Sequence, residues 1–116
     1  FMAHDDIWLP DHLEILGRHF SRPEVELTYS RTLWVAPDGT IAPSAFNLYD
    51  RATLESFLAR EINSISATCV AHRRSCLERY GYWDESLPRN GDWDMWARII
   101  EGGGRRNFVY EPTPTC

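Results

Sequence analysis

The spacing of hydrophobic residues predicts a helix followed by a strand in the first third of the chain. A stripe at helical spacing begins beside Pro10, a residue favoured in the first turn of a helix, so a helix is predicted from about Pro10 to His19. The apolar positions of this stripe are Leu9, Leu13, Leu16 and Phe20. Val25, Leu27 and Tyr29 then alternate with polar residues, which is the period of a half-buried strand. We expect this strand to continue through Val35.

A turn and several shorter elements follow. Proline and glycine in the run Pro37 to Thr40 are typical of a hairpin turn, so a β-hairpin is predicted there. A helix is expected to start near Thr53, and a strand is expected from Ala67 to Ala71. A short helix from Arg74 to Tyr80 should follow, terminated by a left-handed Gly81. A third main helix should carry the apolar residues Trp93, Trp96, Ala97 and Ile100 and end at Gly102 to Gly104, before a strand from Asn107 to Tyr110.

Interleaved strands and helices favour an α/β layer architecture with a mixed sheet and flanking helices. The chain has 116 residues, 43% of them hydrophobic and 13% aromatic, which is the composition of a globular protein. A chain of this size forms one compact core, so residues 1–116 are expected to make a single domain.

Charge and cysteine content limit the classes of binding partner and the cellular compartment that we expect for the chain. A formal charge of −5 opposes nucleic-acid binding, and the basic pairs Arg73-Arg74 and Arg105-Arg106 are too short to track phosphates. The three cysteines cannot all pair within one chain, and their spacing matches neither a zinc ribbon nor a redox motif, so a reducing, cytoplasmic compartment is predicted. No apolar run approaches a transmembrane length, and any peripheral membrane association is left to parts outside this chain.

The first segment with candidate chemistry runs from Ala3 to Pro10. The adjacent carboxylates Asp5 and Asp6 could bind a hard divalent cation through oxygen, and that cation could offset the charge of a diphosphate. The alternative is that both acids are turn and helix-cap residues before Pro10. His4 and His12 have no standard metal spacing and are more typical of solvated or packed histidines.

Two later segments also carry candidate residues. Trp83 follows a glycine turn and could stack on the face of a sugar, although an aromatic residue is more often part of the core. Asp92 stands at the start of an amphipathic helix, where it could act as a general base or simply cap the helix. The sequence pattern leaves both alternatives open.

Taken together, the three segments resemble family 2 glycosyltransferases. Ala3 to Asp6 is similar to the DxD region of that family, Gly81 to Leu87 to its "G-G-F-D-E-x-L" segment, and Gly91 to Arg98 to its "E-D-x-D-L-W-x-R" helix. The order and approximate separation also match. The resemblance covers the chain from the DxD region through the acceptor-side helix, but Ala3 stands where the family has the first acid of DxD.

The resemblance implies a partial GT-A fold that lacks the N-terminal nucleotide-binding strands, which are expected upstream of the abrupt start at Phe1. It implies transfer, with inversion, from a nucleotide sugar such as a UDP-sugar to a hydroxyl of a glycan or another acceptor. Asp5 would hold Mn²⁺ or Mg²⁺ with support from Asp6, and Asp92 would be the base. Acceptor or sugar contacts would come from Trp83, Asp84 and Trp93. The isolated chain would be inactive.

Two other functions remain open. The first is a non-catalytic carbohydrate-binding or scaffold module derived from such a transferase, which the replacement by Ala3 and the missing nucleotide half favour. The second is a metal-dependent phosphoesterase that uses His4, Asp5, Asp6 and His12, with a further ligand from His19 or His72.

Overall fold

A computed structural model describes residues 4–116 of the chain. Helices and strands alternate along it, as the pattern predicts. In chain order the elements are α1 (His12–His19), β1 (Leu27–Arg31), β2 (Leu33–Val35), β3 (Ile41–Pro43), α2 (Arg51–Leu58), the 3₁₀-helix η1 (Ala67–Cys69), β4 (Val70–His72), α3 (Ser75–Tyr80), α4 (Gly91–Gly103), the 3₁₀-helix η2 (Gly104–Arg106) and β5 (Phe108–Pro114).

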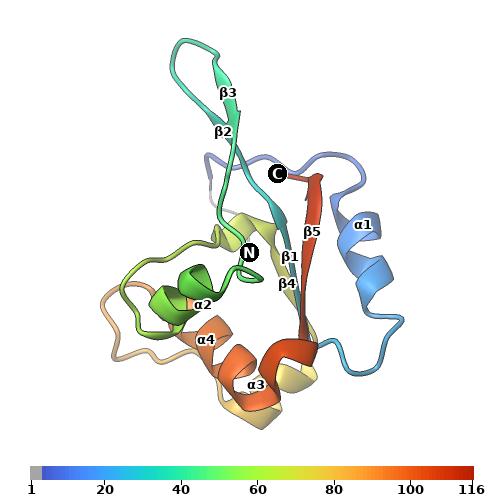
Figure 1. Ribbon diagram of the computed structural model, residues 1–116, viewed down its shortest axis with the longest axis vertical. Helices are drawn as coiled ribbons and strands as arrows, with labels where there is room; N and C mark the ends of the chain where they lie inside the picture. Colours follow the sequence, from blue (N-terminus) through green and yellow to red (C-terminus); the bar gives the residue numbers. More distant parts are fainter. Residues whose placement is uncertain (1–3) are drawn as a thin grey trace.

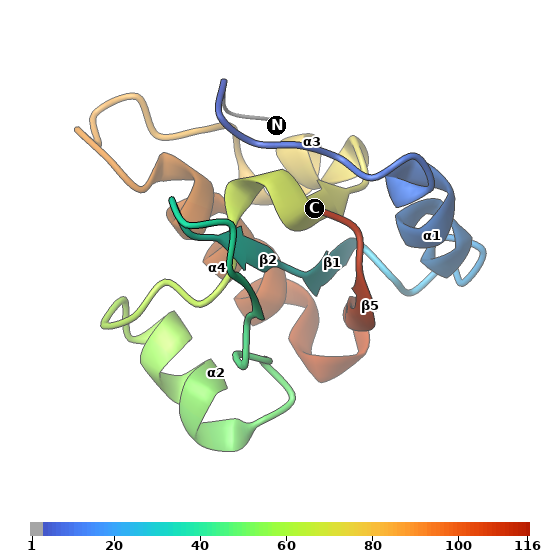
Figure 2. The ribbon, with the colours of Figure 1, turned by 90° about the horizontal axis from the view of Figure 1, so that it is seen from above.

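The main sheet has three strands in the order β4-β1-β5. The central strand β1 is antiparallel to β4 and parallel to β5, with Leu27 opposite His72 on one side and Phe108 on the other. Helix α1 lies on one side of this sheet, and α2 and α4 lie on the other (Figures 1 and 2). The predicted mixed sheet with flanking helices is therefore confirmed.

The core lies between the sheet and α4. Leu27 and Tyr29 of β1 are 0% and 2% exposed, and they belong to the same buried cluster as Trp96 and Ile99 of α4 and Phe57 of α2. The predicted apolar stripe of α4 thus faces the sheet. The helix ends in the predicted glycines, with Gly104 at a φ of 71°, a conformation that glycine adopts without steric penalty.

Strand β1 is buried on both faces, so the prediction of a half-buried strand is wrong. Its polar residues Thr28 and Ser30 are 0% and 3% exposed. Helix α1 contributes the buried residues His12 and Leu16, and Thr115 donates a hydrogen bond to the Ser30 hydroxyl at 2.6 Å. Polar strand residues can be buried when a second layer covers them and supplies hydrogen-bond partners, which holds for Ser30, whereas the buried Thr28 hydroxyl has no partner within residues 4–116.

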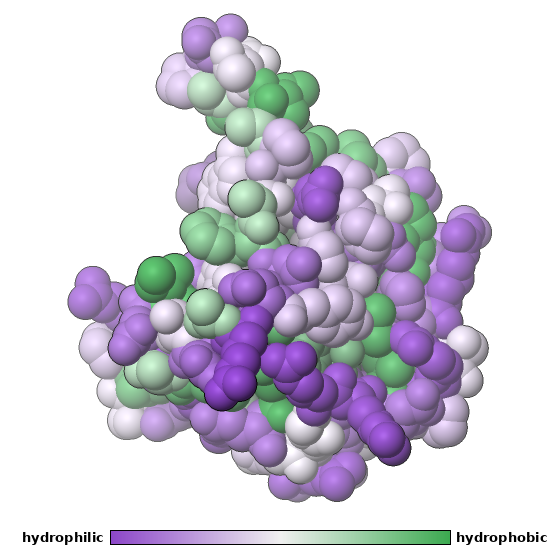
Figure 3. All heavy atoms as spheres, viewed as in Figure 1, coloured by the Kyte–Doolittle hydropathy of each residue, from purple (hydrophilic) through white to green (hydrophobic). Residues whose placement is uncertain are grey.

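The predicted hairpin is confirmed, but the strand before it is not continuous. Ala36 and Thr40 are joined by a backbone hydrogen bond of 2.9 Å across the turn. However, β1 ends at Arg31, and β2 pairs only with β3 in a separate two-stranded sheet. This hairpin projects from the body of the protein (Figure 1) and presents hydrophobic side chains to solvent (Figure 3), including Trp34 at 60% and Ile41 at 60% exposure.

Two local predictions need correction. The run from Ala67 to Ala71 is only partly a strand, because its first three residues form η1 before β4 begins. Gly81 ends α3 with a positive φ of 89°, but its ψ of 161° lies outside the left-handed helical region.

Within residues 4–116, no helix has both the length and the apolar composition needed to cross a membrane.

Candidate functional site

The two later segments of the resemblance are joined by one side chain, Arg98 of α4. Its guanidinium donates hydrogen bonds to the backbone carbonyls of Tyr80, Gly81 and Tyr82, at 3.3 Å for Gly81 and 2.9 Å for Tyr82. A Cβ atom at Gly81 would lie 3.1 Å from the guanidinium, so a glycine lets this group approach the backbone. The loop after α3 is therefore fixed to the outer side of α4.

The start of α4 packs against the same loop. A Cβ atom added to Gly91 would lie 3.4 Å from the Trp83 ring, which indicates that the half-buried indole lies close to the first turn of the helix. The N-cap is Asn90, with a φ of 61° and no side-chain capping bond. Asp92 lies beyond the cap as the second residue of α4. The alternative that Asp92 is the N-cap is therefore wrong.

Asp92 and Asp94 occupy the same turn of α4 but have different surroundings. The Asp94 carboxylate accepts a hydrogen bond from Arg98 Nε at 2.9 Å and lies 3.7 Å from Arg60 Nη2. Asp92 is half-buried, and among residues 4–116 its carboxylate has no hydrogen-bond or ion-pair partner. We call Arg98 and its bonds to the loop carbonyls and to Asp94 the Arg98 clamp. Asp94 is part of this clamp, whereas the contacts of the structure leave the Asp92 carboxylate available to a ligand.

The predicted sugar contacts have three different environments. Trp93 is 7% exposed and donates an indole hydrogen bond to the Phe57 carbonyl at 3.0 Å, so it has little surface left for an acceptor. Asp84 is exposed but accepts hydrogen bonds from the Ser86 amide at 2.9 Å and hydroxyl at 2.6 Å. These bonds lower the pKa of Asp84 and fix it as a turn residue. Trp83 is half-buried, and its contact with a sugar stays a prediction.

The two N-terminal acids are held differently. The Asp5 side chain is 73% exposed and lies 3.7 Å from His4 Nδ1. Asp6 is half-buried and accepts a hydrogen bond from the Thr68 hydroxyl of η1. Ala3 lies outside the described residues. No group of three or more potential metal ligands occurs in the part of the chain that the structure describes. If Asp5 holds the cation and Asp92 is the base, their carboxylates must face one shared cleft, and this convergence is a prediction.

Two histidines of the phosphoesterase alternative have structural partners instead. His12 is 2% exposed, stacks on Trp8 with ring centroids 4.5 Å apart, and lies 2.7 Å from the Thr115 hydroxyl. Burial lowers the pKa of His12, which favours the neutral ring. His19 Nε2 lies 2.9 Å from the Glu111 carboxylate. These contacts favour packing roles over a metal site shared with Asp5.

A disulfide that sequence analysis did not predict joins Cys69 and Cys116, whose Cα atoms are 6.0 Å apart. The chain offered three ways to pair its cysteines and 47 residues separate the two partners, so spacing could not identify the pair. Cys76 is free and buried. Disulfides persist mainly in oxidising compartments, so this bond opposes the reducing compartment that the cysteine spacing favoured, and a cytoplasmic location stays a prediction.

The signal that could have indicated the Arg98 clamp is local. Asp94 and Arg98 are four residues apart, the spacing at which opposite charges meet on a helix.

Comparisons of the chain with protein-family models, with curated proteins and with solved structures found no match.

Proposed function

We propose that this chain is the acceptor-side portion of a nucleotide-sugar-dependent glycosyltransferase with the GT-A fold. In this proposal the Asp92 carboxylate accepts the proton of an acceptor hydroxyl as that oxygen attacks the sugar. The observation that supports it best is the pair of acids on α4, where Asp94 is bound by two arginines and Asp92 has no partner within residues 4–116.

A general base must be held rigidly and must reach the proton that it accepts. Asp92 is followed at once by Trp93 and lies one turn before Trp96, both of which are buried in the core. Trp83 and the Arg98 clamp fix the loop beside it. The backbone that carries Asp92 is therefore anchored on two sides, while its carboxylate is half-exposed.

The exposed Asp5 fits a cation that takes few ligands from the protein. Mg²⁺ is usually bound through one or two carboxylates together with substrate phosphates, so a complete protein cage is not required. When bound, such a cation, Mn²⁺ or Mg²⁺, would stabilise the charge that develops on a leaving diphosphate. Asp6 would position Asp5 through its bond to Thr68. The base- and ribose-binding strands would lie upstream in the parent protein.

The two acids of α4 give a matched pair of variants for the test. In the intact parent protein, release of nucleoside diphosphate from a panel of nucleotide sugars is measured with Mn²⁺, with water as the simplest acceptor. We expect Asp92→Asn to melt like the wild type but to lose about 10²-fold in turnover, the scale of general base catalysis. Asp94→Asn should lower the melting temperature and leave turnover per folded molecule nearly intact.

An Asp92→Asn enzyme that still turns over at the wild-type rate would exclude Asp92 as the base.

The non-catalytic carbohydrate-binding module remains the second candidate, because Asp6 and Asp84 both have structural hydrogen-bond partners. Glycan binding in the wild type without release of nucleoside diphosphate from any nucleotide sugar would favour that module over the transferase.

A further inference from the structure

The Cys69–Cys116 disulfide lies where the central strand leaves the main sheet. Cys69 ends η1 just before β4, and Cys116 follows β5, so the bond connects segments next to the two outer strands of the sheet. Between them, β1 ends at Arg31 after a shift in register, and the chain continues into the projecting hairpin. The disulfide therefore connects the outer segments at the end of β1, with the Cys116 sulfur 3.9 Å from the Ser30 hydroxyl and the Cys69 sulfur 3.1 Å from the Thr32 hydroxyl.

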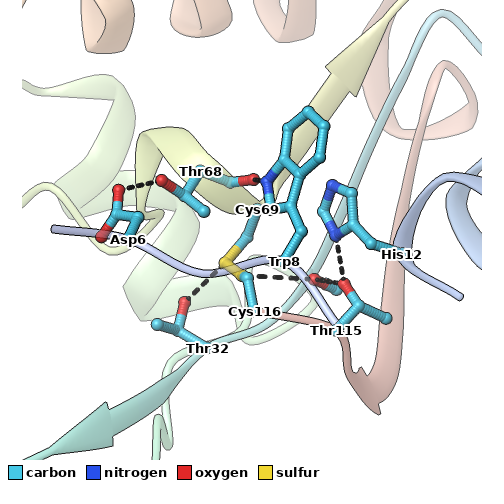
Figure 4. Close-up of a disulfide and its surroundings, with 9 residues drawn as sticks. Asp6, Trp8, His12, Thr32, Thr68, Cys69, Thr115 and Cys116 are labelled. Atoms are coloured by element: carbon cyan, nitrogen blue, oxygen red, sulfur yellow. Dashed lines mark hydrogen bonds between the residues drawn. A yellow bond between two sulfur atoms is a disulfide. The ribbon is translucent and has the colours of Figure 1, made fainter. Parts of the chain in front are cut away.

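The residues that precede the two cysteines hold the N-terminal segment 6–9 (Figure 4). Thr68 donates its hydroxyl hydrogen to Asp6, and its carbonyl accepts a hydrogen bond from the Trp8 indole at 2.9 Å. The carbonyl of Thr115 accepts a hydrogen bond from the Leu9 amide at 2.9 Å. Segment 6–9 is thus attached at both sides of the disulfide.

Burial contributes little else to the position of this segment. Ile7 is 75% exposed and Leu9 is 39% exposed, and residues 6–9 form no helix or strand. Trp8 is half-buried and stacks on His12. Since few apolar contacts anchor these residues, their order depends on the hydrogen bonds to Thr68 and Thr115, on the Trp8–His12 stack and on the bond of 3.0 Å from the His12 amide to the Leu9 carbonyl. The disulfide links the two residues that follow Thr68 and Thr115, and Thr115 is also bonded to Ser30 of β1.

We propose that the Cys69–Cys116 disulfide is a redox-sensitive clasp for segment 6–9. In the oxidised state the disulfide holds segment 6–9 against η1 and the end of β5. Reduction frees the two attachment points from each other, and the segment becomes mobile while the core stays folded. This proposal does not depend on the glycosyltransferase function.

The chemistry of reduction follows from the exposure of the two cysteine residues. Cys69 is 0% exposed and Cys116 is half-buried, so an external thiolate attacks the Cys116 sulfur. A new bond forms between the reagent and Cys116, the Cys69–Cys116 bond breaks, and Cys69 leaves as a thiolate. The Thr32 hydroxyl, 3.1 Å from the Cys69 sulfur, can donate a hydrogen bond to it.

A dithiol reagent completes the reaction. Its second thiolate attacks the reagent's own sulfur in the mixed disulfide and releases Cys116 as a thiolate. Both cysteine thiolates then take protons from water, and the reagent becomes a cyclic disulfide. Two electrons pass from the dithiol to the protein.

The test is NMR relaxation of the ¹⁵N-labelled chain before and after reduction with excess dithiothreitol. We expect the Leu9 amide and the Trp8 indole to change from rigid, with order parameters of about 0.85, to flexible, with values below about 0.6. The Trp93 indole, which is buried and bonded to the Phe57 carbonyl, is the internal control and should not change. Thiol titration of samples unfolded in denaturant should give one free thiol per chain before reduction, from the buried Cys76, and three after it.

Cys116→Ser should give the flexible segment without any reductant, and Cys76→Ala serves as the control that keeps the disulfide. Unchanged order parameters at Trp8 and Leu9 after full reduction would overturn the proposal. So would three free thiols before reduction. Loss of order at the Trp93 indole on reduction would also overturn it, because the bond would then be holding the whole fold together.

Discussion

Glu26 has the strongest set of hydrogen bonds of any carboxylate in the described chain, so its removal has a calculable effect on stability. Glu26 is 8% exposed and accepts hydrogen bonds from Arg79 at 2.8 Å, from the Tyr80 hydroxyl at 2.6 Å and from the Asn107 amide at 3.0 Å. These donors come from α3 and from the residue before β5. The carboxylate thus fixes both segments to the residue that precedes β1.

Glu26→Gln keeps the size of the side chain but replaces one acceptor oxygen with a donor amide. At least one of the three donors then faces another donor. A hydrogen bond to a charged group contributes about 1.5–3 kcal/mol, so we expect a loss of about 2–3 kcal/mol in the free energy of unfolding. For a chain of this length that corresponds to a melting temperature lower by about 8–12 °C.

The loss should depend on pH with a defined sign. Burial alone would raise the pKa of Glu26, but the hydrogen bonds from Tyr80 and Asn107 and the charge of Arg79 outweigh it, so the pKa is lowered. A lowered pKa contributes stability that is present above the unfolded-state value near 4.5 and is lost as the pH falls through the folded-state value. The difference between variant and wild type should therefore be largest at neutral pH and shrink below about pH 4.

Thermal melts followed by circular dichroism at pH 7 and at acidic pH measure this effect. Glu24→Gln is the matched control, because it makes the same chemical change at an exposed position two residues earlier. A Glu26→Gln protein that melts within about 2 °C of the wild type at pH 7 would refute the estimate, since that shift corresponds to about 0.5 kcal/mol.

Two further substitutions test the helices. Gly102→Ala would place a Cβ atom against the Tyr80 ring, which cannot move freely because its hydroxyl is bonded to Glu26, so unfolding experiments in urea should show a loss of about 1–3 kcal/mol. Asp50→Ala removes the N-cap bond to the Thr53 amide at 2.8 Å and should lower stability by about 1 kcal/mol in the same assay, whereas Asp50→Asn should retain most of it.

Periodicity predicted α2 and α4 well because their apolar stripes face one core, whereas in α1, on the other side of the sheet, Leu16 is buried but Leu13 of the predicted stripe is 65% exposed. The stripe of α4 is an example, with Trp93, Trp96 and Ile100 all buried against the sheet and α2. The hairpin was predictable for a different reason, since Gly39 adopts a φ of 83° that the turn requires. In both cases the determinant is local in the sequence.

The predictions that failed depend on partners distant in the sequence. Thr28 and Ser30 look solvent-exposed in the sequence, but α1 and Thr115 cover them from positions before and far after β1. The pairing of Cys69 with Cys116 likewise needs β5 to return beside β1. The alternation of polar and apolar residues predicts which face of a strand would be exposed if no other segment covered it. It carries no information on whether a segment elsewhere in the chain covers that face.

For most of the polar and glycine positions that carry the resemblance, the structure supplies a reason that needs no catalysis. Gly81 allows the Arg98 guanidinium to approach the backbone, Asp84 closes a turn on Ser86, and Asp94 forms an ion pair with Arg98. Stability alone would explain those residue types at those positions. It accounts less fully for the half-buried Asp92, because the dipole of the first turn of α4 favours an acid there but no side chain within residues 4–116 binds its carboxylate. Asp92 is therefore the residue whose substitution best distinguishes a transferase from a structural relative of one.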